Sequence, residues 1–239
     1  MSSIPFAGFH PEALLLLAEN RLQNSTAFYN AHKEELKQKI TVPMRQIFEA
    51  LSDDFAKIDP SMHLISHRVV SRIRRDTRFS KEKSLYRSNI WFMAMRPKSD
   101  DMPPSPCFWF ELNPDASEWN AGVAVFANPP RFMAFLRGEI AAKSDAFLDA
   151  LESAQSCGAI AQIDSFKRDR AGDCPDAVRP FLNAKNFFVM YASNDFGILQ
   201  SPKLIKKLRG IFAAFAPLYQ FYAQTVLDWL SKEQNDQCK

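Results

Sequence analysis

One short stretch of the sequence gathers the residues best suited to bind an anion. Residues 72–87 read RIRRDTRFSKEKSLYR, and the slightly longer stretch from His67 to Arg87 holds eight Lys or Arg residues against two acids, a local net charge of +6. The whole protein carries +3, so the remainder carries 3 − 6 = −3. Guanidinium groups match carboxylate and phosphate oxygens bidentately, and lysines add point charges. We therefore expect a binding site here, with an anion as its ligand.

The candidate site consists of eight residues from this stretch: Arg72, Arg75, Asp76, Arg78, Ser80, Lys81, Lys83 and Tyr86. The cations would hold the anion, and the hydroxyl groups of Ser80 and Tyr86 would donate hydrogen bonds to it. Asp76 lies among positive charges, which should lower its pKa. We therefore expect Asp76 to be an ionised group that orients an arginine, and not a general acid.

The expected partner is a phosphorylated small molecule or a nucleotide. Two other readings of the basic stretch stay open. It could contact a nucleic-acid backbone, with Phe79 and Tyr86 stacking on bases, although a pI near 8.6 and an acidic remainder weaken that reading. It could also be a salt-bridged edge that holds a loop or docks a protein partner, since exposed ion pairs and charged edges are common. We favour an anion because a purely structural network would have balanced charges.

Other features of the sequence exclude several classes of site. Glycine is scarce, at 7 residues, and no glycine-rich phosphate loop is present. The four cysteines are widely spaced, so we expect no metal site, no cofactor, and free thiols in a reducing cytoplasm. The N-terminus lacks the basic start of a signal peptide, and no apolar run is long enough to span a membrane. No nucleophile–base pair can be assigned, which leaves open whether the protein is an enzyme.

Hydrophobic periodicity and turn residues divide the chain into helices and strands. We expect helices over residues 11–22, 25–39, 41–57, 129–153 and 201–230, with Ser25 and Thr41 as N-caps, a break near Ser144 and a kink at Pro217. We expect strands over residues 64–74, 90–95, 107–112, 119–126, 160–166 and 187–191.

These elements predict an α+β fold, with an antiparallel sheet of four to six strands and helices packed mainly on one face. We expect a single domain over residues 1–239. It would comprise a helical part at about 11–57, a central sheet at about 64–126, a second helical part at about 129–230 and a frayed tail at 231–239.

The core RDTRFSK at residues 75–81 resembles the signature of the uncharacterised family called domain of unknown function 2461. The resemblance extends over roughly residues 7–230 and includes the helical stretch FYNAHKE, although Phe28-Tyr29 replaces the usual Trp-Phe pair and Leu85 replaces the usual Pro. It implies one domain and a role for residues 72–86, and it leaves Arg68 and Arg74 as bystanders. The resemblance implies no reaction.

Overall fold

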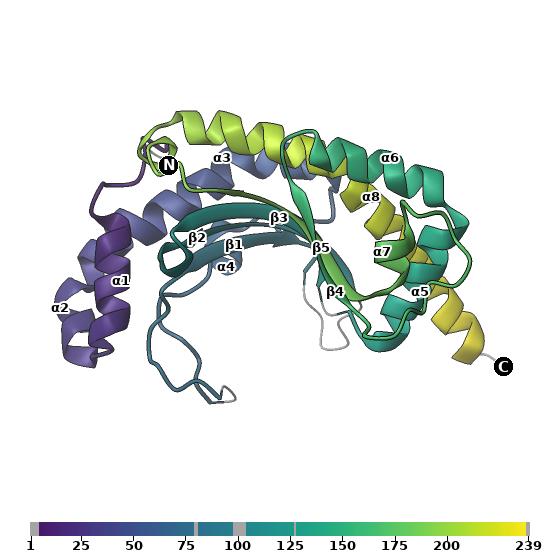
Figure 1. The fold of residues 1–239 in the computed structure, drawn as a ribbon. Coiled ribbons are helices and arrows are strands. Elements are labelled where there is room, and N and C mark those ends of the chain that lie inside the picture. Colours follow the sequence, from purple (N-terminus) through teal and green to yellow (C-terminus); the bar gives the residue numbers. More distant parts are fainter. Residues whose placement is uncertain (1–4, 79–80, 98–103, 127, 238–239) are drawn as a thin grey trace. The chain divides into compact units, whose positions relative to one another are not determined.

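The structure is a computed structural model that describes residues 5–78, 81–97, 104–126 and 128–237, and it describes side chains as far as residue 234. Five strands form one antiparallel sheet in the order β1-β2-β3-β5-β4 (Figure 1). The strands are β1 Ile90–Met95, β2 Ser105–Asn113, β3 Glu118–Phe126, β4 Ile160–Ser165 and β5 Ala184–Ser193. The predicted α+β fold and its antiparallel sheet are confirmed.

The helices lie before, between and after the strands along the chain. The α-helices are α1 Ala13–Gln23, α2 Thr26–Leu36, α3 Val42–Ile58, α4 Ser66–Val69, α5 Pro130–Ala142, α6 Ser144–Gln155, α7 Arg179–Leu182 and α8 Lys203–Gln237. Three short helical segments accompany them: η1 Lys37–Thr41, η2 Pro114–Ala116 and η3 Ile198–Gln200. None of the described helices is both long enough and apolar enough to cross a bilayer.

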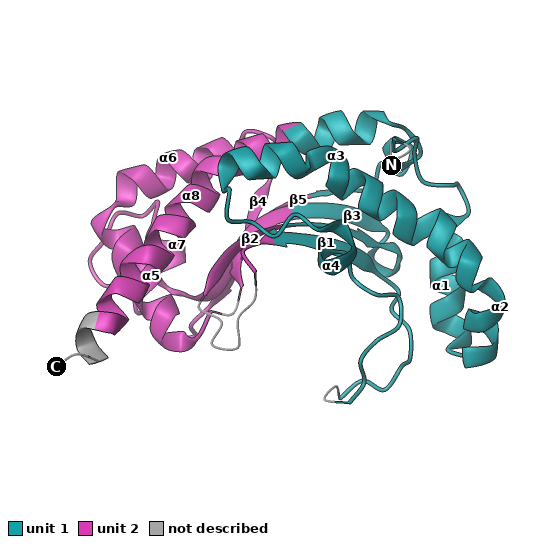
Figure 2. Ribbon diagram, turned by 180° about the vertical axis from the view of Figure 1, so that it is seen from behind, with its two compact units in different colours: residues 1–94, 109–121, 192–209 teal, residues 95–108, 122–191, 210–239 magenta. Residues whose placement is uncertain are grey.

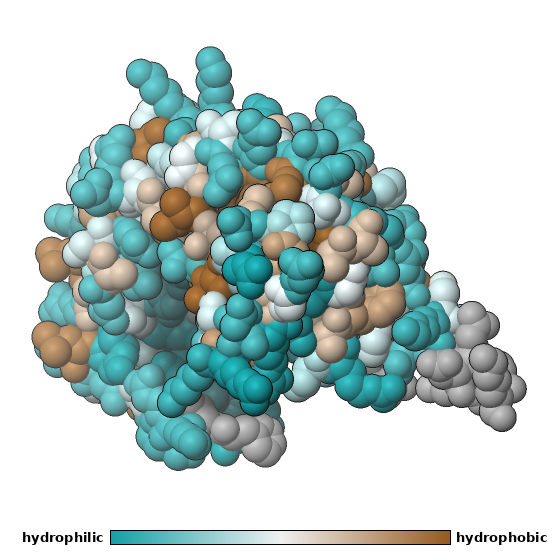
Figure 3. Space-filling model, turned by 45° about the vertical axis from the view of Figure 1, so that its right-hand side comes forward, coloured by the Kyte–Doolittle hydropathy of each residue, from teal (hydrophilic) through white to brown (hydrophobic). Residues whose placement is uncertain are grey.

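The chain forms two compact units, each assembled from three stretches of sequence (Figure 2). Unit 1 consists of residues 1–94, 109–121 and 192–209, and unit 2 consists of residues 95–108, 122–191 and 210–239. The single domain expected from the sequence stays a prediction, and each unit is described by itself. Hydrophilic residues cover most of the face seen in Figure 3, with apolar groups scattered among them.

The core of unit 1 joins α3 to one face of the sheet. The ring of Phe92 on β1 lies 5.2 Å from that of Phe48 and 6.3 Å from that of Phe55, both on α3. Phe110 of β2 lies 5.7 Å from Phe92 on the same face. Because side chains alternate along a strand, Trp91 and Trp109 belong to the opposite face, and both are only half-buried.

The chain enters α1 through a close contact at Gly8. This residue has a φ of +121°, and a Cβ added there would lie 2.4 Å from the carbonyl carbon of Gln200. The next residue, Phe9, donates its N–H to the carbonyl of Leu199 at 2.7 Å. The space and the backbone conformation both require glycine.

Helix α2 starts as predicted, but it does not stop where we expected. The Ser25 Oγ accepts a hydrogen bond from the N–H of Phe28 at 3.4 Å, which confirms the N-cap. Thr41 was expected to cap a third helix, and this prediction is wrong. Its backbone is helical and its side chain forms no cap, because the π-helical turn η1 carries the helix from α2 directly into α3.

The strand expected over residues 64–74 is absent. Residues 66–69 form the short helix α4, and the extended residues after it make two isolated bridges within the described chain, Val70 with Phe92 and Arg74 with Tyr86. This segment pairs first with β1, at Val70, and then with the returning part of the same loop, at Arg74. Because its partner changes after a few residues, it does not form a regular strand. The other five expected strands are confirmed, with small shifts at their ends.

Unit 2 packs helices on its own strands. Phe108 of β2 stacks on Tyr219 of α8 at 4.7 Å, and Phe187 of β5 contacts Phe147 of α6 and Tyr222 of α8, both at 6.3 Å. The predicted break near Ser144 is confirmed, since it separates α5 from α6.

Helix α8 continues to Gln237, beyond the expected end at residue 230. Contacts beyond residue 230 accompany the extension: Lys232 Nζ lies 5.5 Å from the ring centroid of Phe135 of α5, and Glu233 pairs with Arg131 at 3.4 Å. Tertiary packing therefore holds the turns that were expected to fray.

Candidate functional site

The basic stretch forms an arm that leaves the sheet beside β1 and returns to it. We call residues 70–87 the basic arm, visible in Figure 1 as the long loop between α4 and β1. Backbone hydrogen bonds hold its two legs together near the base, from Arg75 N to Leu85 O and from Arg87 N to Ile73 O, both 2.8 Å. The base is tied to β1 by a bond of 2.8 Å from Ser71 N to Trp91 O. The arm is thus attached to the sheet without being one of its strands.

Glu82 holds two arginines from different parts of the chain. Its two carboxylate oxygens each lie 2.7 Å from a guanidinium nitrogen, one on Arg75 of the arm and one on Arg21 of α1. The Ser84 hydroxyl donates to the same carboxylate. This hydrogen bond, together with the charges of Arg75 and Arg21, lowers the pKa of Glu82. Glu82 is therefore ionised and fixes both arginines in place.

A third arginine lies at the base of the arm. The guanidinium of Arg87 lies 4.5 Å from the ring centroid of Trp91, and its buried Nε has no hydrogen-bond partner in the part of the chain that the structure describes. Burial lowers the pKa of Arg87, and the positive charge of Arg75 lowers it further. We call Arg21, Arg75, Arg87 and Glu82 the arginine cluster. Its net charge is 3 − 1 = +2.

Asp76 and Arg78 form a separate pair further along the arm. The Arg78 Nε lies 3.0 Å from Asp76 Oδ1, and its Nη2 lies 2.6 Å from Oδ2. These hydrogen bonds, helped by the Arg78 backbone N–H, lower the pKa of Asp76 to about 2. The pKa of Asp76 is lowered, as the sequence indicated. The pair is neutral overall, so it adds no net attraction for an anion.

The other cations of the predicted site lie around these two groups. Arg72 and Lys81 are exposed, and the charge of Arg72 contributes to the lowered pKa of Asp76. Lys83 donates its Nζ to the carbonyl of Thr77 at 3.0 Å and so links the two legs of the arm. Ser80 lies outside the described residues.

Tyr86 lies inside the protein. Its side chain is fully buried and stacks on Tyr29 of α2, with ring centroids 4.8 Å apart and an angle of 23° between the rings. The neighbouring Leu85 donates its N–H to Asn24 Oδ1, at the end of α1, at 2.7 Å. Tyr86 is thus placed to anchor the returning leg of the arm against α2, a different role from the donor that the sequence suggested.

Sequence reasoning missed two members of the arginine cluster. Arg87 belonged to the charge run but was not assigned to the site, and Arg21 is 61 residues from its partner Glu82. Nothing in the sequence links Arg21 to the arm, because this contact depends on how α1 packs. Arg87 could have been found from its place three residues before the buried strand β1.

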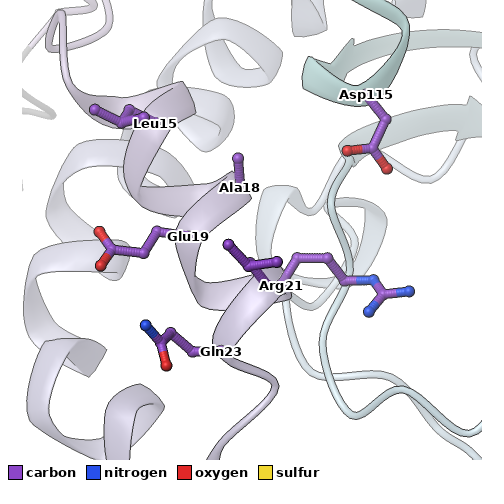
Figure 4. Close-up of a pocket in the computed structure, with 7 residues that line it drawn as sticks. Leu15, Ala18, Glu19, Arg21, Gln23 and Asp115 are labelled. Atoms are coloured by element: carbon purple, nitrogen blue, oxygen red, sulfur yellow. The ribbon is translucent and has the colours of Figure 1, made fainter.

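A cleft of about 710 Å³ lies along α1, and Arg21 is one of the residues that line it. Residues 15–23 of α1 form one wall and Asp115 of η2 contributes to the other (Figure 4). Two of its apolar residues, Leu15 and Leu22, are exposed. Its charged groups are Glu19, Asp115 and Arg21, and Glu82 already holds Arg21. Two carboxylates against one engaged guanidinium make this cleft a poor place for an anion.

A metal site has no support in the described part of the chain, where no three His, Cys, Asp or Glu side chains gather closely enough to hold an ion.

Comparison with known proteins identifies a family and nothing closer. Neither the search of curated proteins nor the search of solved structures gave a match. The model of the family described as conserved hypothetical protein DUF2461 matches residues 12–221, a span that contains the whole basic arm and Arg21. The chain therefore belongs to the DUF2461 family.

Proposed function

We propose that the protein binds the phosphate group of a small molecule at the arginine cluster. One observation carries the proposal: two guanidinium groups share a single carboxylate, and a third, on Arg87, adds its charge close enough to interact with Arg75, which leaves a net charge of +2 in a group that is partly buried. Guanidinium forks suit phosphate oxygens, and charge-assisted hydrogen bonds of this kind are stronger than neutral ones. A phosphate would supply the missing negative charge.

The surrounding arm supports the same reading. Arg72, Arg74 and Lys81 are exposed cations. The described arm contains seven Lys or Arg residues and two acids, so its field attracts anions to the cluster. Glu82 keeps Arg21 and Arg75 in fixed positions, and such preorganisation lowers the entropy cost of binding. We keep the cytoplasm as the proposed location, on the ground of the widely spaced cysteines.

Thermal denaturation with inorganic phosphate and pyrophosphate tests the proposal. A ligand at 100 times its Kd stabilises a protein by about 2.7 kcal/mol, which is about 5–10 °C for a chain of this size. We expect Arg75→Ala and Arg87→Ala to abolish the shift. Arg209→Ala is the matched control, because Arg209 also belongs to unit 1 and pairs with Asp54 at 2.7 Å, outside the cluster. The proposal fails if phosphate and pyrophosphate leave the wild type unchanged, or if both cluster variants respond like the control.

Glu82→Gln gives a test in the opposite direction. The substitution raises the net charge of the cluster from +2 to +3 and removes the carboxylate that competes with the ligand. We expect phosphate to bind more tightly to this variant, because the added positive charge and the removed competitor outweigh the weaker hold on Arg21 and Arg75, a gain that damage to the fold would not produce. Weaker binding would contradict a charge-driven site. Oligonucleotide binding that falls steeply with salt, without any response to phosphate, would instead indicate nucleic-acid binding.

A further inference from the structure

The face of the sheet turned away from α3 in unit 1 carries polar and aromatic side chains. We call these residues the open face: Asn89, Trp91, Trp109, Glu111, Glu118 and Asn120. The alternation of the strands places them there, since Phe92 and Phe110 point the other way and pack with α3. All except Asn120 are half-buried, so a ligand in solution can reach them.

A hydrogen-bond network fixes the open face. The Glu111 carboxylate accepts from Asn89 Nδ2 at 2.5 Å and from Asn120 Nδ2 at 3.3 Å. The indole N–H of Trp109 donates to Asn120 Oδ1 at 2.8 Å. Asn120 Nδ2 also lies 3.4 Å from a Glu118 oxygen. A single buried amide therefore links two carboxylates and a tryptophan, which holds all of them in fixed orientations.

These groups suit a partner that carries several hydroxyl groups. An ionised carboxylate has about four lone-pair sites, and the hydrogen bonds of Glu111 to other described residues use two of them. Carboxylates accept hydrogen bonds from hydroxyls, while half-buried tryptophan rings offer flat apolar surfaces beside them. Two carboxylates disfavour a phosphate at the same point. The open face thus suits the uncharged part of an anionic ligand.

Arg87 connects the open face to the arginine cluster. Its guanidinium lies over Trp91 of the open face, and its charge acts on Arg75 of the cluster. Asn89, which lies between Arg87 and Trp91 in the sequence, donates to Glu111 at 2.5 Å, so positive, aromatic and negative groups are neighbours at this part of unit 1. A ligand that carries both a phosphate and hydroxyl groups can contact the positive and the negative groups at the same time.

We infer that the ligand is a phosphate ester of a polyhydroxyl compound, of the sugar phosphate class, with its phosphate at the arginine cluster and its hydroxyl groups on the open face. This inference rests on the proposed function and adds the class of the ligand. The phosphate alone would bind through the cluster, and the hydroxyl-bearing part would add affinity through Glu111, Glu118 and Trp109.

Calorimetric titration of the full chain tests the inference with four probes: inorganic phosphate, ribose 5-phosphate, glucose 6-phosphate and unphosphorylated glucose. We expect at least one sugar phosphate to bind tenfold or more tightly than phosphate, and glucose to bind weakly. Glu111→Gln should reduce this advantage several-fold and leave the affinity for phosphate unchanged or higher. Glu19→Gln, the same change in the cleft along α1, is the control and should alter neither affinity.

The outcomes separate this inference from the proposed function. If phosphate binds and neither sugar phosphate binds more tightly, the inference is wrong and the proposed function stands. If none of the phosphate compounds binds, both fail. A nucleoside monophosphate that binds more tightly than either sugar phosphate would also overturn the inference, since it would point to base stacking on the tryptophans. Glu118→Gln repeats the test at the second carboxylate, which lies 3.4 Å from Asn120 Nδ2, in case Glu111→Gln does not fold.

Discussion

Tyr86 provides the sharpest test of how the basic arm is anchored. The sequence suggested a hydroxyl donor to the anion, whereas the structure buries the side chain completely, stacks it on Tyr29 and gives its hydroxyl no partner among the described residues. A buried hydroxyl without a hydrogen bond costs about 1–3 kcal/mol. Tyr86→Phe keeps the ring and removes that cost, so the free energy of unfolding should rise by about 1 kcal/mol or more.

Tyr86→Ala should have the opposite effect. Truncating a large buried aromatic residue costs about 3–5 kcal/mol, and the lost stacking on Tyr29 falls within that range. For a chain of this size, the melting temperature should fall by about 10 °C. Urea denaturation followed by circular dichroism measures both variants, and phosphate titration of Tyr86→Phe should match the wild type. If Tyr86→Phe loses tenfold in phosphate affinity while its stability is unchanged, the hydroxyl contacts the ligand and this reasoning is refuted.

Three further predictions concern the local environments of single groups. Asp76 should titrate with a pKa of about 2 in an NMR pH series, below its ordinary value of 3.8. Its ion pair with Arg78 is therefore fully formed above pH 3.8 and is lost as the pH falls through 2. Arg78→Ala should return the midpoint towards 3.8, and an unchanged midpoint would be inconsistent with the pair. Gly8→Ala should lower the free energy of unfolding by about 2 kcal/mol or more, measured by urea denaturation, because the φ of +121° and a backbone contact of 2.4 Å both oppose a Cβ. Cys107 should resist alkylation at pH 8 while Cys157 reacts, as read by mass spectrometry, because burial raises the pKa of Cys107 to about 12 and Cys157 is half-exposed; equal labelling would show that Cys107 is accessible.

The sequence was sufficient for most of the fold because strong local signals agreed with the packing. The strands that became β1, β2 and β3 carry apolar runs that tertiary contacts reinforce, and Ser25 marks the start of α2 by capping chemistry alone. The prediction that Thr41 caps a new helix was wrong because a threonine followed two residues later by a proline is also the pattern of a true helix start. The π-helical turn that joins α2 to α3 at Thr41 has no signature in the sequence.

The candidate site was harder to predict because it depends on contacts between distant residues. The charge run located the arm correctly, yet charge patterns cannot show which cations are already paired. Arg78 is neutralised by Asp76 two residues away, while Arg75 shares its carboxylate with Arg21, which lies on a different helix. The pairing decides where the excess positive charge remains, and only the fold determines the pairing.

The failure of the strand expected over residues 64–74 is connected to the site. A regular strand in this position would have its backbone held by continuous hydrogen bonds to a neighbouring strand. The described part of the arm is instead held at isolated bridges. Its cations must therefore be positioned by other contacts: Tyr86 against α2, Leu85 on Asn24, and Glu82 with Arg21. All three contacts involve α1 or α2. The N-terminal helices thus serve as the support of the arm, so a change in their packing should alter anion binding without touching a single cation of the charge run.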